Sequence, residues 1–179
     1  MKCFILSLMM GFTPVIVSAA TPALSGDDFS VSINKHIFAL GEQWDEKSGT
    51  LAGQEVNSNF IGEMPVGESV YRFYQHNYAH FSLYSSNLYW DKEKRSIDDY
   101  ILSQITLLSA DVKTFRDVAI GSSAESLMRK YGQGKIDKSD GEYWIEYVHQ
   151  DKQISFQIEN GRVVSIIMII LIDDVTPSE

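Results

Sequence analysis

The sequence predicts an α+β fold in which two tandem repeats of strand, helix and hairpin form a mainly antiparallel sheet with helices on one face. Three observations support this prediction. Short runs alternate apolar and polar residues with the period of two that strands require. Two short amphipathic segments, each followed by glycine, separate those runs. The last run, residues 163–172, is apolar at nearly every position, which is typical of a strand in the middle of a sheet.

The composition favours one acidic domain with a hydrophobic core. The chain has 179 residues, of which 44% are hydrophobic and 22% are charged. Lys and Arg total 15 against 24 Asp and Glu, so the formal net charge is −9. A surface of that sign repels nucleic-acid phosphates and anionic lipid headgroups. We therefore expect neither nucleic acid nor a membrane surface as a partner.

Residues 1–20 have the three parts of a secretory signal peptide. Lys2 precedes an apolar run over residues 4–17, and Ser18, Ala19 and Ala20 supply the small residues of a cleavage site. A membrane anchor is the alternative, but the run is shorter than the roughly 20 residues that cross a bilayer. Cys3, the only cysteine, lies before this run and would be removed with it. A thiol-free exported chain is typical of the bacterial periplasm, and it excludes disulfides, thiolate metal sites and cysteine catalysis.

The first repeat is expected over residues 29–108, after a flexible leader at residues 21–28. Strands are predicted at residues 29–33 and 37–40. A helix follows over residues 42–51, with Gly53 ending it. The hairpin alternates over residues 71–76 and returns at 81–83, and a further strand is expected at residues 100–108.

The second repeat is expected over residues 109–172, with a short tail completing a single domain at 29–179. Ser122 or Ser123 is a plausible N-cap for a helix that Gly132 ends. The helix presents an apolar stripe made by Ala124, Leu127, Met128 and Tyr131. A hairpin is predicted over residues 143–148 and 154–158, and Asn160-Gly161 turns the chain into the strand at 163–172. We expect that strand to be central and covered on both faces.

The segment Thr114-Phe115-Arg116-Asp117-Val118-Ala119-Ile120-Gly121-Ser122-Ser123 carries a resemblance to known proteins. With the glycine that ends the following helix, it resembles the tandem α/β modules of beta-lactamase inhibitor protein and of the small outer-membrane assembly lipoproteins. The first repeat departs from this pattern, since Leu40-Gly41-Glu42 lacks the serines, and the acylated cysteine of the lipoproteins is missing. The resemblance implies a periplasmic binding module whose sheet surface grips another protein. In size, acidity and export signal the chain is also similar to immunity proteins of type VI secretion toxins.

The residues that carry chemistry in enzymes do not form a recognisable set here. His76 and His80 flank a predicted turn without a suitably spaced acid, so they are expected to form hydrogen bonds rather than bind zinc. Gly121-Ser122-Ser123-Ala124-Glu125 lacks the second glycine of a nucleophile elbow, and helix capping accounts for its serines. The remaining acids of interest lie in predicted loops or at strand ends, where acids are usually solvated: Asp98, Asp99, Asp137, Asp140, Asp173 and Asp174. We therefore predict no enzymatic activity, no catalytic residue, no metal and no cofactor.

Aromatic residues are the predicted contact residues. Alternation in the hairpin is expected to bury Tyr71, Phe73, Phe81 and Leu83 on one face and to turn Tyr74 and Tyr84 to the other. The loop at residues 85–97 has no counterpart in the second repeat and carries Tyr89, Trp90, Asp91 and Glu93. Exposed aromatic side chains are enriched at protein interfaces. Two alternatives stay open for the loop: insertion into a partner's cleft, or packing as a two-turn surface helix.

These features predict a periplasmic immunity or inhibitor protein that binds and neutralises a toxin, most simply a secreted effector that acts on the cell wall. The alternative is a non-enzymatic accessory protein that scaffolds envelope or secretion-apparatus assembly. A small enzyme is a third possibility, for which the sequence offers no acid–base or nucleophile set.

Overall fold

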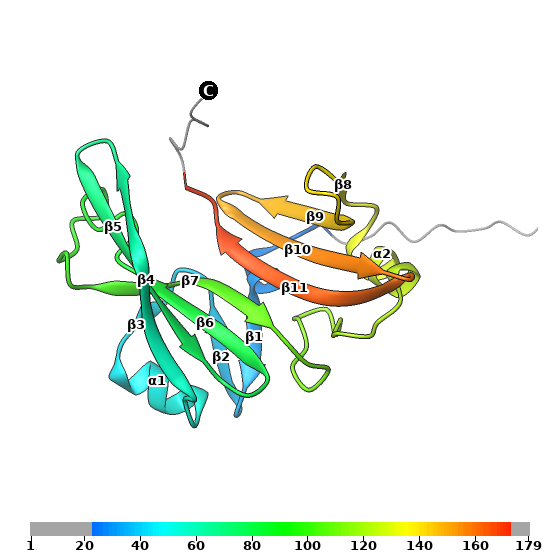
Figure 1. The fold of residues 1–179 in the computed structure, drawn as a ribbon, viewed down its shortest axis with the longest axis horizontal. Helices are drawn as coiled ribbons and strands as arrows, with labels where there is room; N and C mark the ends of the chain where they lie inside the picture. Colours follow the sequence, from blue (N-terminus) through cyan, green and yellow to red (C-terminus); the bar gives the residue numbers. More distant parts are fainter. Residues whose placement is uncertain (1–22, 173–179) are drawn as a thin grey trace, which may run out of the picture.

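A nine-stranded antiparallel sheet forms the body of the molecule (Figure 1). The computed structural model describes residues 23–172. The helical elements are η1 (Gly26–Phe29), α1 (Glu46–Ala52) and α2 (Ala124–Tyr131). The strands are β1 (Ser30–Ile33), β2 (His36–Ala39), β3 (Gln43–Trp44), β4 (Asn57–Val66), β5 (Ser69–Asn77), β6 (Phe81–Ser86), β7 (Tyr100–Leu107), β8 (Lys135–Asp137), β9 (Trp144–His149), β10 (Lys152–Glu159) and β11 (Arg162–Ile170). This confirms the α+β class and the mainly antiparallel sheet.

The strand order places two sequence-distant strands side by side at the centre. The order is β4-β5-β6-β7-β11-β10-β9-β8, with β3 also paired to β7. β7 and β11 pair antiparallel, with Ile105 opposite Met168. The sheet therefore continues from the first half of the chain into the second without a break.

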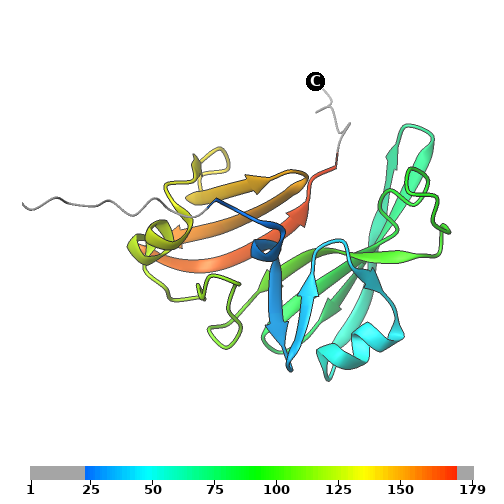
Figure 2. The ribbon, with the colours of Figure 1, turned by 180° about the vertical axis from the view of Figure 1, so that it is seen from behind.

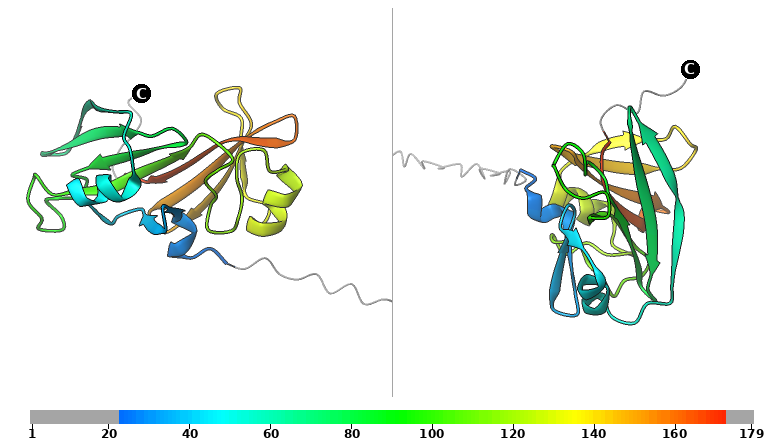
Figure 3. Two further views of the ribbon diagram at one scale, coloured as in Figure 1. Left: turned by 90° about the horizontal axis from the view of Figure 1, so that it is seen from below. Right: turned by 90° about the vertical axis from the view of Figure 1, so that its left-hand side faces the viewer.

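The other elements lie on one side of this sheet. Seen from behind, the β1–β2 hairpin, η1, α1 and α2 are in front of the strands (Figure 2). Figure 3 shows the sheet from two further directions, with its opposite face uncovered. The core lies between the sheet and this cover, where Phe29, Phe38 and Leu127 meet Ile105 and Phe156 with no exposed surface. Burying an aliphatic or aromatic side chain of this size stabilises a fold by about 1.5–3 kcal/mol.

Helix α1 begins later than the sequence predicted. The Asp45 carboxylate accepts a hydrogen bond from the Ser48 amide at 2.8 Å, which caps the helix at that point. Trp44, expected inside the helix, instead pairs with Tyr100 as part of β3. The end of the helix is as predicted, since Gly53 follows it with a positive φ of 110°.

Helix α2 matches its prediction at both ends. Ser123 is the N-cap, and its hydroxyl accepts a hydrogen bond from the Ser126 amide at 3.1 Å. Gly132 ends the helix by donating its amide to the Met128 carbonyl at 2.8 Å. Ser122 accepts from the Ala119 amide, so both serines have structural partners.

Strand β11 is central, but only one of its faces is covered. Val163, Ile166, Met168 and Ile170 are buried, whereas Ile167 and Ile169 are half-buried on the opposite face. The prediction of cover on both faces is therefore wrong. The apolar run gave no sign of this because aliphatic side chains occupy both faces of the strand.

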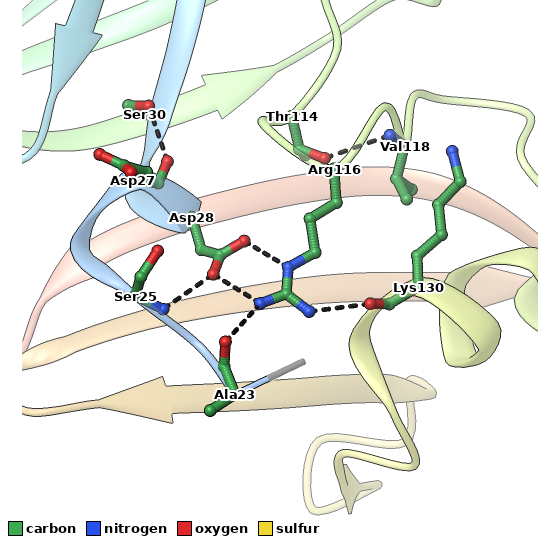
Figure 4. A network of polar contacts seen from close by, with 9 residues as sticks. All are labelled: Ala23, Ser25, Asp27, Asp28, Ser30, Thr114, Arg116, Val118 and Lys130. Atoms are coloured by element: carbon green, nitrogen blue, oxygen red, sulfur yellow. Dashed lines mark hydrogen bonds and ion pairs between the residues drawn. The ribbon is translucent and has the colours of Figure 1, made fainter. Parts of the chain in front are cut away.

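Two strands and one turn were absent from the predictions. β4 and β8, the two ends of the sheet, had not been predicted as strands. The leader at residues 21–28 was expected to be flexible, yet Gly26–Phe29 forms a 3-10 turn and the Asp28 side chain is buried. Arg116 holds that carboxylate from across the chain (Figure 4). Residues 1–20, the predicted signal peptide, lie outside the described residues.

The loop after β6 packs against the molecule without forming a helix. Leu88 is buried, and Trp90 is half-buried against the core. The Tyr89 hydroxyl donates to the Leu171 carbonyl at 3.0 Å, which fastens the loop to the end of β11. The loop packs down as one of the two alternatives predicted, in a series of turns rather than a two-turn helix, and insertion into a partner's cleft stays a prediction.

Candidate functional site

The two predicted contact residues of the hairpin lie on opposite faces of the sheet. Tyr74 pairs with Ser85, and its neighbour Gln75 pairs with Tyr84. Because side chains alternate along a strand, Tyr74 and Tyr84 point to opposite sides. The prediction that they share a face is wrong. It assumed that Leu83 faced away from Tyr74, whereas Leu83 pairs with His76 on the same side as Tyr74.

The predicted contact residues of the loop have partners within the fold. Asp91 accepts hydrogen bonds from the hydroxyls of Ser69 at 2.6 Å and Tyr71 at 3.2 Å. Glu93 forms an ion pair with Arg95 at 2.8 Å. The loop, with Tyr89 and Trp90, is therefore fastened to β5 and to the end of β11.

A cleft of about 760 Å³ lies between α1 and the sheet, and it is a candidate site. It combines the beginning of α1, the middle of β5 and the residues that lead into β7. Its lining residues are Gln43, Trp44, Asp45, Glu46, Gly49, Thr50, Gly53, Glu55, Tyr74, His76, Ser85, Asp98, Asp99 and Tyr100.

The cleft is acidic and aromatic. Five carboxylates line it, from Asp45, Glu46, Glu55, Asp98 and Asp99, and none of its lining residues is Lys or Arg. All five acids are solvent-exposed. Fields from like charges add where the walls exclude water, so this cleft attracts cations.

Three aromatic side chains and a histidine form the walls between the acids. The Tyr74 ring meets the Tyr100 ring edge-on, with 5.5 Å between the ring centroids, and its centroid lies 5.2 Å from that of Phe60. Trp44 lies over His76 at 4.7 Å. Ring faces carry partial negative charge, so they favour the same cationic groups as the carboxylates.

His76 is held at the floor of the cleft by three oxygen atoms. Its Nε2 lies 2.9 Å from Ser85 Oγ, and its Nδ1 lies 3.1 Å from Ser58 Oγ and 3.5 Å from Glu55 Oε1. Burial lowers the pKa of His76 below its usual value, and the opposing effect of Glu55 is smaller. A neutral imidazole therefore adds no positive charge to the cleft near neutral pH.

The uncovered face of the sheet has a different chemistry, because two rows of directly paired residues cross it with little charge. In the first row, each residue stands opposite the next from Asn59 through Gln75, Tyr84, Gln104, Ile169 and Gln153 to Val148. In the second row the order is Asn57, Asn77, Ser82, Thr106, Ile167, Ser155, Glu146 and Lys135. Hydrogen bonds between amide and hydroxyl side chains join neighbours in these rows. For example, Gln75 Nε2 donates to the Tyr84 hydroxyl at 2.8 Å.

An apolar hollow of about 420 Å³ opens on this face beside Tyr84. Phe73, Met64, Ile169 and Ile172 are among its lining residues, together with Leu88 from the packed loop. Tyr84 thus has a place in a surface recess, while Tyr74 belongs to the acidic cleft.

The described part of the chain shows no metal centre. Within residues 23–172, no three His, Cys, Asp or Glu side chains lie close enough to hold an ion. His80 contacts Ser109 and Asp111 at 3.1 Å, His36 meets Phe38 edge-on, and His149 stacks on Phe29. Nor does any helix within that range combine the length and apolar character needed to cross a membrane.

The sequence interpretation missed most of the cleft. Asp98 and Asp99 were interpreted as solvated acids in loops or at strand ends, and Trp44 as part of a helix. The available signal was the position of Asp98 and Asp99 immediately before the strand that begins at Tyr100, because residues at a strand end are held in place by the sheet. Nothing local indicates that Glu55 and Asp45 would lie beside them.

Comparison with known proteins gives a partial structural similarity and no family match. No family model and no curated protein matches the chain. One solved structure that resembles it is the uncharacterized protein yfeY from Escherichia coli. The two share 16% sequence identity with a TM-score of 0.47, over 80% of this chain and 97% of that one.

Proposed function

We propose that this protein is a periplasmic immunity or inhibitor protein that binds a toxin and neutralises it. The observation that carries the proposal is the acidic, aromatic cleft beside α1, whose lining holds five carboxylates and neither Lys nor Arg. A partner that places a lysine or arginine side chain there gains charge attraction and contact with aromatic rings. The partner's basic group would then be withdrawn from its own substrate.

The toxin proposed is a secreted effector that acts on the cell wall. The active cleft of such an enzyme accepts peptides that bear carboxylates, so it favours basic residues. The net charge of −9 supports rapid association with a basic partner, since complementary charge raises the rate of encounter. The uncovered sheet face supports a broad contact, because its weakly charged rows of amides and hydroxyls lose little on desolvation when each finds a partner.

We further propose that the fold consists of two repeats. Each half runs from a short helix into four strands: α1 leads into β4, β5, β6 and β7, and α2 leads into β8, β9, β10 and β11. The last strands of the two halves meet at the centre of the sheet, and the first strands form its ends. This mirrored order supports duplication of one unit.

Periplasmic location is part of the same proposal and rests on the sequence. Lys2, the apolar run at residues 4–17 and the small residues ending at Ala20 support export. Delivery of a type VI secretion toxin into the periplasm of a sister cell would place the toxin and this protein in one compartment.

A co-culture experiment tests the proposal. A strain of the producing bacterium that lacks this gene is grown alone and beside the wild type. We expect lysis only beside the wild type, with protection restored by the full gene and not by one that lacks residues 1–20. An envelope defect in the strain grown alone would instead favour the accessory-scaffold alternative.

Two charge variants test whether the cleft is responsible for protection. Glu46→Gln, Glu55→Gln and Asp98→Asn together remove three cleft carboxylates, and this variant should fail to protect. Glu125→Gln, Asp151→Asn and Glu159→Gln remove the same charge from exposed sites outside the cleft lining and should protect fully. Equal protection by both would remove the cleft from the proposal.

A further inference from the structure

The two ends of the sheet differ greatly in length. β8, at one end, has three residues, whereas β4, at the other, has ten. β4 pairs with β5 on one side, and within residues 23–172 no strand pairs with its other side. A strand edge of this length presents a row of backbone amides and carbonyls that can accept another strand.

Large apolar side chains are exposed along this edge. Val56, just before β4, is 66% exposed, and Phe60 and Ile61 are 54% and 51% exposed. Ile61 occupies a bulge, because Phe60 pairs with Tyr74 while Gly62 pairs with the adjacent Phe73. Contiguous exposed apolar side chains on a sheet edge are typical of a surface that another chain covers.

A second copy of this protein is a poor occupant for the edge. Each copy carries a formal net charge of −9, and Glu55, Glu63 and Glu68 lie along or beside this strand. The charge instead complements a segment that carries basic residues.

A recess adjoins the edge strand on each face of the sheet. Glu55, two residues before β4, lines the acidic cleft together with Tyr74, the partner of Phe60. Ile61 and Met64 of β4 line the apolar hollow on the opposite face. Side chains of an added strand alternate between the two faces of the sheet. A strand that alternates basic and apolar residues would therefore direct its basic side chains to the acidic cleft and its apolar side chains to the apolar hollow.

We propose that β4 binds an extended segment of a partner protein by strand addition, and that this segment alternates basic and apolar residues. Backbone hydrogen bonds to the outer edge of β4 supply the binding, and the two recesses select the side chains. The inference rests on the proposed function only in taking the partner to be a protein, and it requires neither a toxin nor export.

The probe is a fluorescently labelled peptide of ten residues that alternates Lys and Val. The protein chain, beginning at residue 21, is titrated into the labelled peptide. We expect saturable binding and slower hydrogen exchange at the β4 amides, with the β8 amides unchanged. Two peptides serve as controls: one alternates Glu and Val, and one is the Lys-Val peptide with methyl groups on alternate backbone nitrogens. Both should bind at least about tenfold more weakly.

Protein variants complete the test. Phe60→Lys with Ile61→Lys should weaken binding by about tenfold or more. Leu108→Lys with Phe115→Lys changes two equally exposed apolar residues outside the sheet and should leave binding unchanged. Thermal melts of all variants establish that they are folded. Absence of saturable binding at millimolar protein, equal binding of the methylated peptide, or protection away from β4 would overturn the proposal, and none of these outcomes decides the co-culture experiment.

Discussion

Asp28 and Arg116 form a two-point ion pair although 88 residues separate them in the sequence. Arg116 Nε lies 2.5 Å from Asp28 Oδ1, and Arg116 Nη2 lies 2.8 Å from Oδ2 (Figure 4). The guanidinium also donates to the carbonyls of Ala23 and Lys130. The partly buried Arg116 side chain therefore joins the beginning of the described chain to the end of α2, which fixes the cover of the second half of the sheet.

Replacing Arg116 should destabilise the fold strongly. The Asp28 side chain is 1% exposed and that of Arg116 is 13% exposed, so Arg116→Met leaves a buried carboxylate without its charge partner. Loss of one partner from a buried pair costs about 3–5 kcal/mol. Urea unfolding of the chain from residue 21 measures the change. The double variant with Asp28→Asn should recover part of the loss, and a change below about 0.5 kcal/mol in the single variant would contradict a structural role for the pair.

Gly134 has no room for a side chain. It has a φ of +62°, and an added Cβ would lie 2.6 Å from Ile145 Cγ2 and 2.8 Å from Tyr147 Cζ. Gly134→Ala should therefore combine backbone strain of about 1–2 kcal/mol with overpacking of about 1–3 kcal/mol. Gly141→Ala is the matched control, because its φ is +86° and nothing lies within 4 Å of the new Cβ. The melting temperature of Gly134→Ala should lie well below that of Gly141→Ala. Equal melting temperatures would show that the loop relaxes freely.

His76 should make the stability of the protein depend on pH. Burial lowers its pKa in the folded chain from the usual 6.5, so the unfolded chain binds a proton at a pH where the folded chain does not. The free energy of unfolding should be unaffected by His76 above pH 6.5 and should fall as the pH drops below that value. Urea unfolding at pH 7.5 and 5.5 measures this loss, which should shrink in His76→Gln. His80→Gln, which replaces an exposed histidine, is the control variant and should keep the loss seen in the unaltered protein. An unchanged pH dependence in His76→Gln would exclude the buried imidazole as the source of the loss.

Local backbone chemistry explains which elements could be predicted. Ser123 and Gly132 mark the two ends of α2, and Asn160-Gly161 marks the turn before β11, because caps and turns depend on neighbouring residues alone. β4 lacked such a signal. Its residues are exposed or half-buried on both faces and a bulge interrupts their alternation, so no period of two records the strand.

The candidate site was harder to predict because it depends on pairing between distant strands. Glu55 and Asp98 reach one cleft only because β5, β6 and β7 are neighbours in the sheet. The sequence did identify Tyr74 as a surface aromatic residue, and its position in the cleft depends on the register that sets it opposite Ser85. Arg116 stood in the segment that carried the resemblance, but its partner Asp28 was assigned to a flexible leader.

The packing of the loop after β6 can be tested separately from any binding role. Leu88 is 1% exposed, so Leu88→Ala should cost about 2–5 kcal/mol through lost burial and the cavity left behind. Ile97, 37% exposed in the same loop, is the control, and its replacement by Ala should cost far less. Urea unfolding distinguishes the two. A loop held in place only by a partner would give similar small losses for both variants.

The cleft acids should bind a cationic peptide more strongly than the same number of acids elsewhere. Pentalysine is the probe, titrated by calorimetry at 10 mM and 150 mM salt. The cleft variant replaces Glu46 and Glu55 by Gln and Asp98 by Asn, and the control variant makes the same kind of change at Glu125, Asp151 and Glu159. At low salt the cleft variant should bind the peptide more weakly than the control variant does, because the cleft acids surround one volume. Binding should be weaker for every variant at 150 mM, where the screening length is about 8 Å, and the control change should then have almost no effect because acids far from the cleft are screened. If both variants weakened binding equally, the attraction would belong to the net charge of −9 and not to the cleft.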